Sequence, residues 1–403
     1  MKATSERRFF MQVHRVRRGE SIFGIAREYA VSPAGIIQTN GLENPDALAV
    51  GEELLILRPS RTYTASAGDT VGIVARRFGI KRDDIFASNP QLLCDDRLYE
   101  GQILALGYSD SRLGMAASNG CLYRDCSEES LRRAMPYLTY LTVAAAIAES
   151  GRISQIFDAR WALKRAKECG KVVILRVYCK DGYGMRGDEA ERERFIDLLV
   201  NAATDGGYDG ITLSVPEASE QEHEEFMMAL RKRMIGSGLI LFTEAVCGGE
   251  HKYADYADGC VLSYDKLGVQ GAKDFEQGER SAFYKYAEES ESSKTFIDIT
   301  SFALSNGAFI PYSEATRTAA RAGAKIVCDE DLGVCYYSYN GRGGKHIEVK
   351  YESLKNIIAK LELLGELGYM GISFDVGRTP IAHLMAYNAL FSGICYASVF
   401  NQR

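Results

Sequence analysis

The sequence has 403 residues and a formal net charge of -6 at pH 7, and 46% of its residues are hydrophobic. This length and composition predict a globular chain with more than one domain and enough apolar residues for sizeable cores. The negative charge argues against the basic surface that is typical of nucleic-acid-binding proteins, so no nucleic-acid partner is expected. No run of about 18 apolar residues occurs, so no membrane span is expected either.

The N-terminal segment is rich in arginine, and the pair Phe9-Phe10 stands where a secretion signal has an apolar run of about 7 to 15 residues. We therefore expect synthesis in the cytoplasm without a signal peptide. The cysteines and histidines are scattered, with no Cys-x-x-Cys motif and no metal-ligand spacing. This scatter predicts reduced, buried cysteines, no disulfide framework, no metal and no cofactor.

Residues 12–57 and 62–106 repeat one another. Gly19-Glu20-Ser21 aligns with Gly68-Asp69-Thr70, and apolar residues follow each tripeptide at spacings of three, four and seven. This spacing predicts one face of a short helix that is capped by the hydroxyl residue. Asn40 and Asn89 align further along, and each copy ends in a Gly-x-x-Leu sequence. We predict the order strand, helix, helix, strand for each copy.

This repeat resembles a pair of LysM modules, which bind polymers of N-acetylglucosamine such as peptidoglycan or chitin. The resemblance implies a groove between the loop before the first helix and the loop after the second. The candidate glycan-binding residues are Gly19, Glu20, Ser21, Ile22, Asn40, Gly41 and Leu42 in the first copy, and Gly68, Asp69, Thr70, Val71, Asn89, Pro90 and Gln91 in the second. The alternative for each residue is that it only forms a turn or a helix cap. Tethering two weak sites would strengthen binding to a polymer.

Residues 107–120 are rich in Gly, Ser and Ala and predict a linker. From residue 121 to about 400, short apolar runs alternate with amphipathic segments, as in repeated β-α units. The expected strands are 139–145, 172–178, 210–215, 239–245, 259–264, 295–299 and 371–374, with another near Leu122. The predicted fold class is therefore α/β: two small βααβ modules, then a (β/α)8 TIM barrel with a small insertion before its last strand.

Residues 208–217 read Tyr-Asp-Gly-Ile-Thr-Leu-Ser-Val-Pro-Glu. They resemble the fourth barrel strand of family-18 glycoside hydrolases, whose signature is Asp-Gly-x-Asp-x-Asp-x-Glu. Residues 261–265 resemble the sixth-strand Met-x-Tyr-Asp motif of that family. Residues 345–355 and 371–374 resemble the closing part of bacterial spore-wall N-acetylglucosaminidases that carry N-terminal LysM pairs.

The resemblance implies substrate-assisted hydrolysis, in which the last Glu of the signature protonates the leaving oxygen and the preceding Asp orients the acetamide of the sugar. In this chain those positions hold Pro216 and Ser214, and the earlier Asp position holds Thr212. Glu217 lies one residue late. Because side chains alternate between the faces of a strand, Glu217 is expected to point away from the lumen unless a bulge turns it back.

The remaining candidate catalytic residues are Asp209, Glu217, Tyr264 and Asp265, and the candidate cleft residues are Ser214, Phe374 and Asp375. Phe374 is a candidate to replace the Trp that the family usually places beneath the reacting sugar. The leading hypothesis is a peptidoglycan-binding protein of the spore or cell wall with a catalytically impaired barrel. The alternatives are an active N-acetylglucosaminidase that uses Glu217 on cortex peptidoglycan, and a scaffold whose partners are spore-coat proteins.

Overall fold

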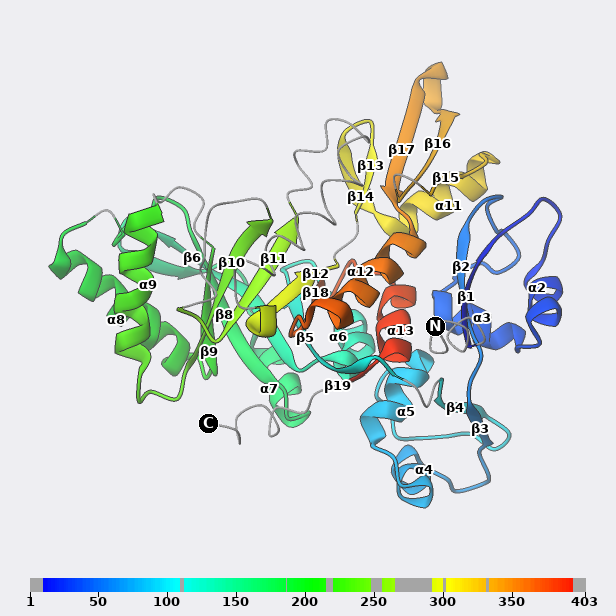
Figure 1. The fold of residues 1–403 in the computed structure, drawn as a ribbon, viewed down its shortest axis with the longest axis horizontal. Coiled ribbons are helices and arrows are strands. Elements are labelled where there is room, and N and C mark those ends of the chain that lie inside the picture. The colour runs from blue at the N-terminus through cyan, green and yellow to red at the C-terminus, as the bar shows by residue number, and fades with distance from the viewer. Residues whose placement is uncertain are drawn as a thin grey trace.

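The structure is a computed structural model that describes residues 10–108, 112–185, 187–214, 220–247, 256–264, 292–299, 302–330 and 333–393. The chain forms two small N-terminal modules, a closed barrel of parallel strands, and a five-stranded sheet inserted before the last barrel strand (Figure 1). None of the helices in the described ranges is both long enough and apolar enough to cross a lipid bilayer.

Both modules have the predicted order of strand, helix, helix and strand. Module 1 consists of β1 (Met11–Arg15), α2 (Ile22–Tyr29), α3 (Pro33–Asn40) and β2 (Glu53–Leu57). Module 2 consists of β3 (Arg61–Thr64), α4 (Val71–Phe78), α5 (Arg82–Ser88), the short 3-10 helix η1 (Pro90–Leu92) and β4 (Ile103–Gly107). The two strands of each module pair antiparallel. Ile25 and Val74, which align in the repeat, are 1% and 0% exposed and anchor the two small cores.

All eight expected barrel strands are present. They are β5 (Gly114–Leu122), β6 (Tyr140–Glu149), β8 (Val172–Cys179), β9 (Gly210–Ser214), β10 (Ile240–Cys247), β11 (Gly259–Tyr264), β12 (Thr295–Asp298) and β18 (Gly371–Asp375). Neighbouring strands pair parallel, and β5 closes the barrel by pairing with both β6 and β18. The short strands β7 (Arg152–Gln155) and β19 (Phe391–Gly393) extend this sheet.

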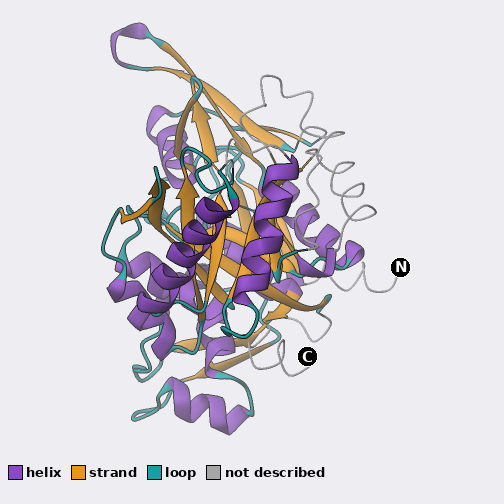
Figure 2. Cartoon of the chain, turned by 90° about the vertical axis from the view of Figure 1, so that its left-hand side faces the viewer, coloured by secondary structure: helices purple, strands orange, loops and turns teal. Residues whose placement is uncertain are grey.

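Helices cover the outside of the barrel strands (Figure 2). They are α6 (Glu128–Ala134), the 3-10 helix η2 (Met135–Tyr137), α7 (Arg160–Glu168), α8 (Glu189–Asp205), α9 (Glu220–Met234), α12 (Leu354–Leu367) and α13 (Ile381–Leu390). Inside the barrel, the rings of Tyr140, Phe242 and Phe296 pack with centroids 5.0 to 5.8 Å apart. The part of the lumen around these rings is therefore a packed core. Ligand access is expected only at the other end, where the carboxyl ends of the strands lie.

The insertion before the last barrel strand is an antiparallel sheet in the order β14-β13-β17-β16-β15, together with helix α11 (Tyr312–Ala322). Its strands are β13 (Phe302–Ser305), β14 (Ala308–Pro311), β15 (Val327–Asp329), β16 (Val334–Asn340) and β17 (His346–Glu352). The hairpin of β16 and β17 projects away from the barrel in both views (Figures 1 and 2).

The expectation that the cysteines are reduced is wrong for one pair. Cys328 and Cys335 face each other in the β15–β16 register and form a disulfide. A spacing of seven residues gave no sign of this pairing, because only the strand register brings the two sulfurs together. Cys179 and Cys260 are buried free thiols, whereas the free thiols of Cys94, Cys121, Cys126 and Cys169 are half-buried.

The predicted linker 107–120 is also corrected. Residues 114–120 belong to β5, the first barrel strand, because their small side chains suit the crowded contact with β18. The modules consequently lie against the rest of the chain. The hydroxyl of Tyr137 in η2 donates to the carbonyl of Ala87 in module 2 at 2.7 Å. In module 1, the N–H of Ile326 in the insertion donates to the carbonyl of Val50 at 2.8 Å.

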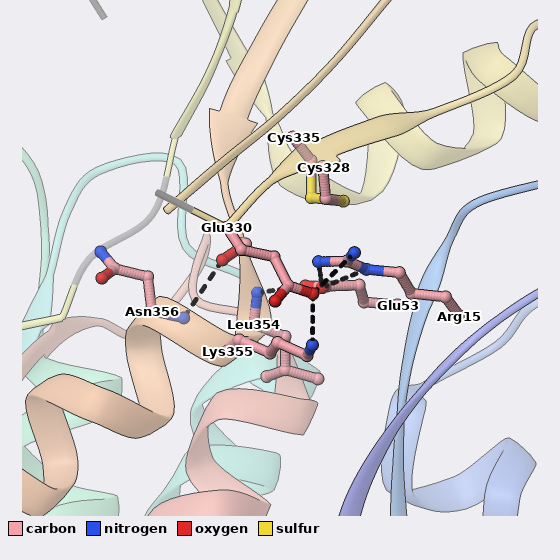
Figure 3. The surroundings of a disulfide bond; sticks show 9 residues. Arg15, Glu53, Cys328, Glu330, Cys335, Leu354, Lys355 and Asn356 are labelled. Carbon is pink, nitrogen blue, oxygen red and sulfur yellow. Dashed lines mark hydrogen bonds and ion pairs between the residues drawn. A yellow bond between two sulfur atoms is a disulfide. The ribbon is translucent and has the colours of Figure 1, made fainter. Parts of the chain in front are cut away.

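A network of charges next to the disulfide joins module 1 to the insertion and to α12 (Figure 3). Arg15 of β1 pairs with Glu53 at 3.1 Å and with Glu330 at 3.0 Å. Glu330 also accepts a hydrogen bond from Lys355 at 2.7 Å, and the second carboxylate oxygen of Glu53 accepts from the N–H of Leu354 at 2.8 Å. Because these contacts come from three parts of the chain, module 1 is held as part of the main body of the protein.

Candidate functional site

The hydroxyl residues of the two tripeptides begin the first helix of each module. Ser21 Oγ accepts a hydrogen bond from the N–H of Gly24, and Thr70 Oγ1 accepts one from the N–H of Ile73, both at 3.2 Å. Each cap satisfies one of the backbone donors that a helix N-terminus leaves without a partner. These two predicted glycan-binding residues therefore have a structural role that does not depend on a ligand.

The acidic residues of the tripeptides tie down the preceding loops. Glu20 accepts hydrogen bonds from the N–H of Arg17 at 2.7 Å and from His14 at 2.8 Å. Burial raises the pKa of Glu20, but these two partners outweigh that effect and hold it below its usual value. Asp69 accepts from the hydroxyl of Tyr63, and this bond lowers the pKa of Asp69.

The amides of Asn40 and Asn89 clamp the second helix of each module to its last strand. Asn89 Nδ2 donates to the carbonyls of Ile85 and Ala105, both at 2.7 Å, and its Oδ1 accepts from the N–H of Ala105 at 2.9 Å. Asn40 makes the same three bonds, two of them to the backbone of Leu55. These side chains were predicted to contact glycan. The structure instead directs their polar atoms into the modules.

The two predicted grooves differ in how their loops meet. In module 2, the N–H of Val71 donates to the carbonyl of Asp96 at 2.9 Å, and the N–H of Gly72 donates to Asp96 Oδ1 at 3.0 Å. Thr70 and Arg97 form a β-bridge beside these bonds. In module 1 the loop before α2 meets the loop before β2 at Val16, whose N–H donates to the carbonyl of Glu52 at 2.9 Å and whose carbonyl accepts from the N–H of Gly51 at 2.7 Å. Within the described residues 10–57, no bond from the first turn of α2 corresponds to those of Val71 and Gly72.

Among the remaining predicted groove residues, Ile22 is buried like Val71 and Gly19 is exposed like Gly68, so the modules differ only after the second helix. In module 2, Val71 is buried, Pro90 is buried and Gln91 is half-buried, so Gly68 is the most accessible of its set. In module 1, Gly41 is exposed and Leu42 is half-buried. Both of these residues line a cavity between module 1 and the barrel.

Inward-facing positions at the mouth of the barrel lumen are identified by strand alternation. Ile174 of β8 and Phe242 of β10 belong to the cluster that fills the lumen, so Arg176 and Glu244, two residues further along, also face inward. Ile211 and Leu213 of β9 pack in the outer cluster, so Thr212 and Ser214 face the lumen. The two positions where family-18 enzymes carry aspartates are thus directed into the lumen with uncharged side chains.

An ion pair that the sequence analysis missed crosses this mouth. Arg176 donates to both carboxylate oxygens of Glu244, at 2.6 and 2.7 Å. The same guanidinium donates to the hydroxyl of Tyr123 at 3.1 Å and to Ser214 Oγ at 3.4 Å. The negative charge of Glu244 and the phenol of Tyr123 raise the pKa of Arg176 despite its burial, so the guanidinium keeps its charge. The sequence contains one sign of this ion pair: Arg176 interrupts the apolar run of β8 at a position that alternation directs into the barrel.

Asp209 is at the opposite end of the barrel. It precedes β9, its Oδ2 accepts from the N–H of Val173 at 2.8 Å, and its Oδ1 pairs with Lys167. Asp209, a candidate catalytic residue, therefore lies away from the carboxyl ends of the strands. Glu217 and Asp265 lie outside the described residues, as does the side chain of Tyr264.

The other two candidate cleft residues, Phe374 and Asp375, are adjacent at the end of β18. Phe374 is fully buried in the cluster between the strands and the outer helices, because its neighbour Ser373 takes the inward position. Phe374 is thus not the expected replacement for the family's Trp. Asp375 is 3% exposed, and its Oδ1 accepts from the N–H groups of Gly377 and Arg378 in the turn after β18. Burial raises the pKa of Asp375.

A pocket of about 550 Å³ opens beside the ion pair. Tyr123 and Tyr178 contribute aromatic rings to it, Ile147 and Ile156 contribute apolar walls, and Arg176 lies in its lining. Aromatic and apolar surface with a few polar groups is typical of small-ligand sites. In the described part of the mouth, Ser214 lies beside the guanidinium of Arg176, which also holds the carboxylate of Glu244 and the hydroxyl of Tyr123.

The comparison with known families identifies the N-terminal modules. The LysM domain family matches residues 14–57 and 63–107. The N-terminal part of the chain is a pair of LysM domains. Among curated proteins, the chain is 21% identical over 243 residues to a relative of Bacillus subtilis strain 168 that is named "putative sporulation-specific glycosylase YdhD". The match covers 57% of this chain and 57% of YdhD, so the chain spans little more than half the length of that relative.

Solved structures show that the whole architecture has precedents. The spore cortex-lytic enzyme SleL of Bacillus megaterium QM B1551 superposes with a TM-score of 0.73 at 19% identity, covering 96% of this chain and 99% of SleL. SleL of Bacillus cereus gives 0.71 at 18% identity, with the same coverage. A chitinase of Chromobacterium violaceum ATCC 12472 gives 0.58 at 15% identity and covers 68% of this chain and 98% of the chitinase. The LysM pair and the chitinase-like barrel are therefore confirmed as the fold.

Proposed function

We propose that the protein binds peptidoglycan, or another glycan that contains N-acetylglucosamine, and that its barrel hydrolyses this glycan poorly or not at all. The LysM matches support the binding half of the proposal. The similarity to SleL, named as a spore cortex-lytic enzyme, and to YdhD, named for sporulation, supports a location in the wall of a spore or cell.

The Arg176–Glu244 pair is the observation that carries the proposal of an impaired barrel. Substrate-assisted hydrolysis needs a carboxylate that orients the acetamide and a carboxylic acid that protonates the leaving oxygen. At the orienting position this chain has Ser214, whose hydroxyl accepts a hydrogen bond from Arg176. Glu244 brings a carboxylate to the mouth, but both of its oxygens already accept hydrogen bonds from Arg176, so the ion pair would have to open before Glu244 could orient an acetamide.

Binding is tested with the full chain, because both LysM domains pack against the barrel. Purified protein is mixed with insoluble peptidoglycan from spores, and the bound fraction is measured after sedimentation. We expect most of the protein in the pellet and its release by soluble N-acetylglucosamine oligomers. Protein that stays in the supernatant at all peptidoglycan concentrations would refute the binding proposal.

Hydrolysis is tested by the release of reducing ends from cortex fragments. We expect the wild-type protein to match a no-enzyme control. The competing hypothesis of an active glucosaminidase predicts a measurable rate that Glu217→Gln lowers by about 10² to 10⁴ fold, the usual contribution of a general acid. Glu193→Gln on the exposed face of α8 is the matched control, since it removes the same charge away from the lumen. A rate lost in the first variant and kept in the second would overturn the impaired-barrel proposal.

A further inference from the structure

A cavity of about 540 Å³ lies between module 1 and the barrel, and we name it the interface cavity. It is lined by the loop after α3, by α6, by α11 and by the start of α13. Its size falls in the range of small-ligand sites, which occur preferentially at interfaces between domains. Gly41 and Leu42, which belong to the predicted glycan groove of module 1, form part of its wall. A ligand in that groove would therefore lie next to the interface cavity.

Four arginines from three separate elements converge on the interface cavity. They are Arg133 of α6, Arg317 and Arg321 of α11, and Arg378 of the turn before α13. The side chains of Arg133 and Arg321 are 43% and 67% exposed. Arg133 pairs with Glu129 at 2.6 Å, and Arg321 pairs with Glu314 at 3.6 Å. A guanidinium has five N–H donors, so such a pair leaves it able to donate to a further carboxylate.

The glutamates that line the interface cavity are engaged with backbone N–H groups or with its arginines. Glu52 and Glu53 are each 9% exposed, and they accept hydrogen bonds from the backbone N–H groups of Ala49 and Leu354. Glu43 is the exposed acid of the lining, and it pairs with Arg317 at 2.7 Å. Arg317 also pairs with Glu314 at 3.1 Å, and Arg378 pairs with Asp125 at 2.8 Å. The charges around the cavity are therefore close to balanced, and what Arg133 and Arg321 offer a ligand is the N–H donors that their ion pairs do not use.

We propose that the interface cavity binds the carboxylate-bearing peptide of a peptidoglycan strand whose sugars lie along module 1. This inference rests on the proposed glycan-binding function and deepens it, because it names a substituent that chitin does not carry. Planar guanidinium groups match carboxylates in a bidentate geometry, and the apolar side chains of Leu42 and Ile381 can cover the stem of a short peptide. The arrangement selects peptidoglycan over an uncharged polymer of the same sugar.

The test measures the affinity of the full chain for three soluble probes by isothermal titration calorimetry. The probes are a disaccharide carrying its acidic peptide, the same disaccharide after amidase has removed the peptide, and an uncharged N-acetylglucosamine oligomer. We expect the peptide to increase affinity by about tenfold, as two charge-assisted contacts would. The combined substitution Arg133→Gln and Arg321→Gln should abolish this increase and leave the affinity for the uncharged oligomer unchanged.

The matched control is Arg160→Gln with Arg194→Gln, which removes the same charge from α7 and α8 on the far side of the barrel (Figure 1). The control should keep the increase due to the peptide. Ser313→Trp, at an exposed position in the cavity lining, should block the peptide by volume and not by charge. Equal affinity for the first two probes, or a peptide effect that survives both cavity variants, would overturn the inference. Failure to bind even the uncharged oligomer would count against glycan binding by the LysM domains.

Discussion

The two LysM domains have the same fold and the same internal supports, yet their predicted grooves are not equivalent. In both, a hydroxyl caps the first helix, an acid holds the preceding loop, and an asparagine clamps the second helix. In module 2, Asp96 joins the two loops that should form the groove. In module 1 these loops are joined at Val16, without bonds like those of Asp96 to the start of the first helix in the described residues 10–57, and the second loop borders the interface cavity.

The two copies have therefore kept the residues that hold each module together, but they have not kept the same arrangement of loops at the predicted glycan groove. The residues that align between the two copies are mostly those that complete hydrogen bonds inside each module. The single residue inserted before Leu98 lies in the loop that carries Asp96 and Arg97. We therefore predict that module 1 is the stronger glycan-binding domain and that module 2 mainly supports the barrel.

The largest expected effect comes from the asparagine clamp that both modules share. Asn89→Ala leaves three backbone groups without their partner in a site that is 3% exposed. The free energy of unfolding should fall by about 2 to 4 kcal/mol, because each unsatisfied buried group costs roughly 1 to 3 kcal/mol and water satisfies part of it. Asn40→Ala should cost less, since Asn40 is half-buried.

Urea unfolding followed by circular dichroism measures both losses. The control is Asn340→Ala, at an exposed position of the projecting hairpin, where no loss is expected. Equal effects of the two clamp variants would contradict the assigned difference in burial.

A second prediction separates the two grooves by their binding. Gly19 and Gly68 have φ values of +85° and +82°, and a Cβ at either position would meet no atom within 4 Å. Leucine at either position should therefore cause similar backbone strain. Gly19→Leu should weaken binding of N-acetylglucosamine oligomers by about tenfold, close to 1.4 kcal/mol, whereas Gly68→Leu should leave it unchanged. If Gly68→Leu has the same effect as Gly19→Leu, the groove of module 2 binds glycan as well.

A third prediction tests what the modules have in common. Ser21→Ala and Thr70→Ala each remove one cap, and each should lower the free energy of unfolding by about 1 kcal/mol. Denaturant midpoints of the two single variants should be alike, and the double variant should show the sum, because the two caps do not share a partner. A much larger loss for one cap would show that its hydroxyl has a further role.

The smallest expected effect concerns pH. Hydrogen bonds from Tyr63 and from the N–H of Ser66 hold the pKa of Asp69 below its usual value. A carboxylate whose pKa is lowered by folding stabilises the folded state above its unfolded pKa and loses that contribution as the pH falls through its folded pKa. Asp69→Asn should therefore lower the unfolding temperature by a few degrees at pH 7, and the difference from wild type should shrink in acid. A difference that is independent of pH would contradict this assignment.

Much of the fold was predictable because its signals are local. The period of three and four residues around Ile25 and Val74 indicates a helix face wherever that helix packs, and Ser21 and Thr70 cap the residues directly after them. The eight barrel strands were also correct, since each is a short apolar run between helical segments. The insertion before the last strand was expected as well, but its disulfide was not.

The sequence by itself determined the two LysM domains, the strands of the barrel and the absence of the family-18 acids at residues 212, 214 and 216. Only the tertiary structure decided which groups meet. Arg176 and Glu244 are 68 residues apart and pair because two strands flank β9 with matching inward positions. From the sequence, the amide of Asn89 could face either a ligand or its own module. In the structure it bonds to the backbone of Ala105 in β4 and therefore faces its own module. Side-chain direction depends on register and packing between distant segments, which no local pattern of residues contains.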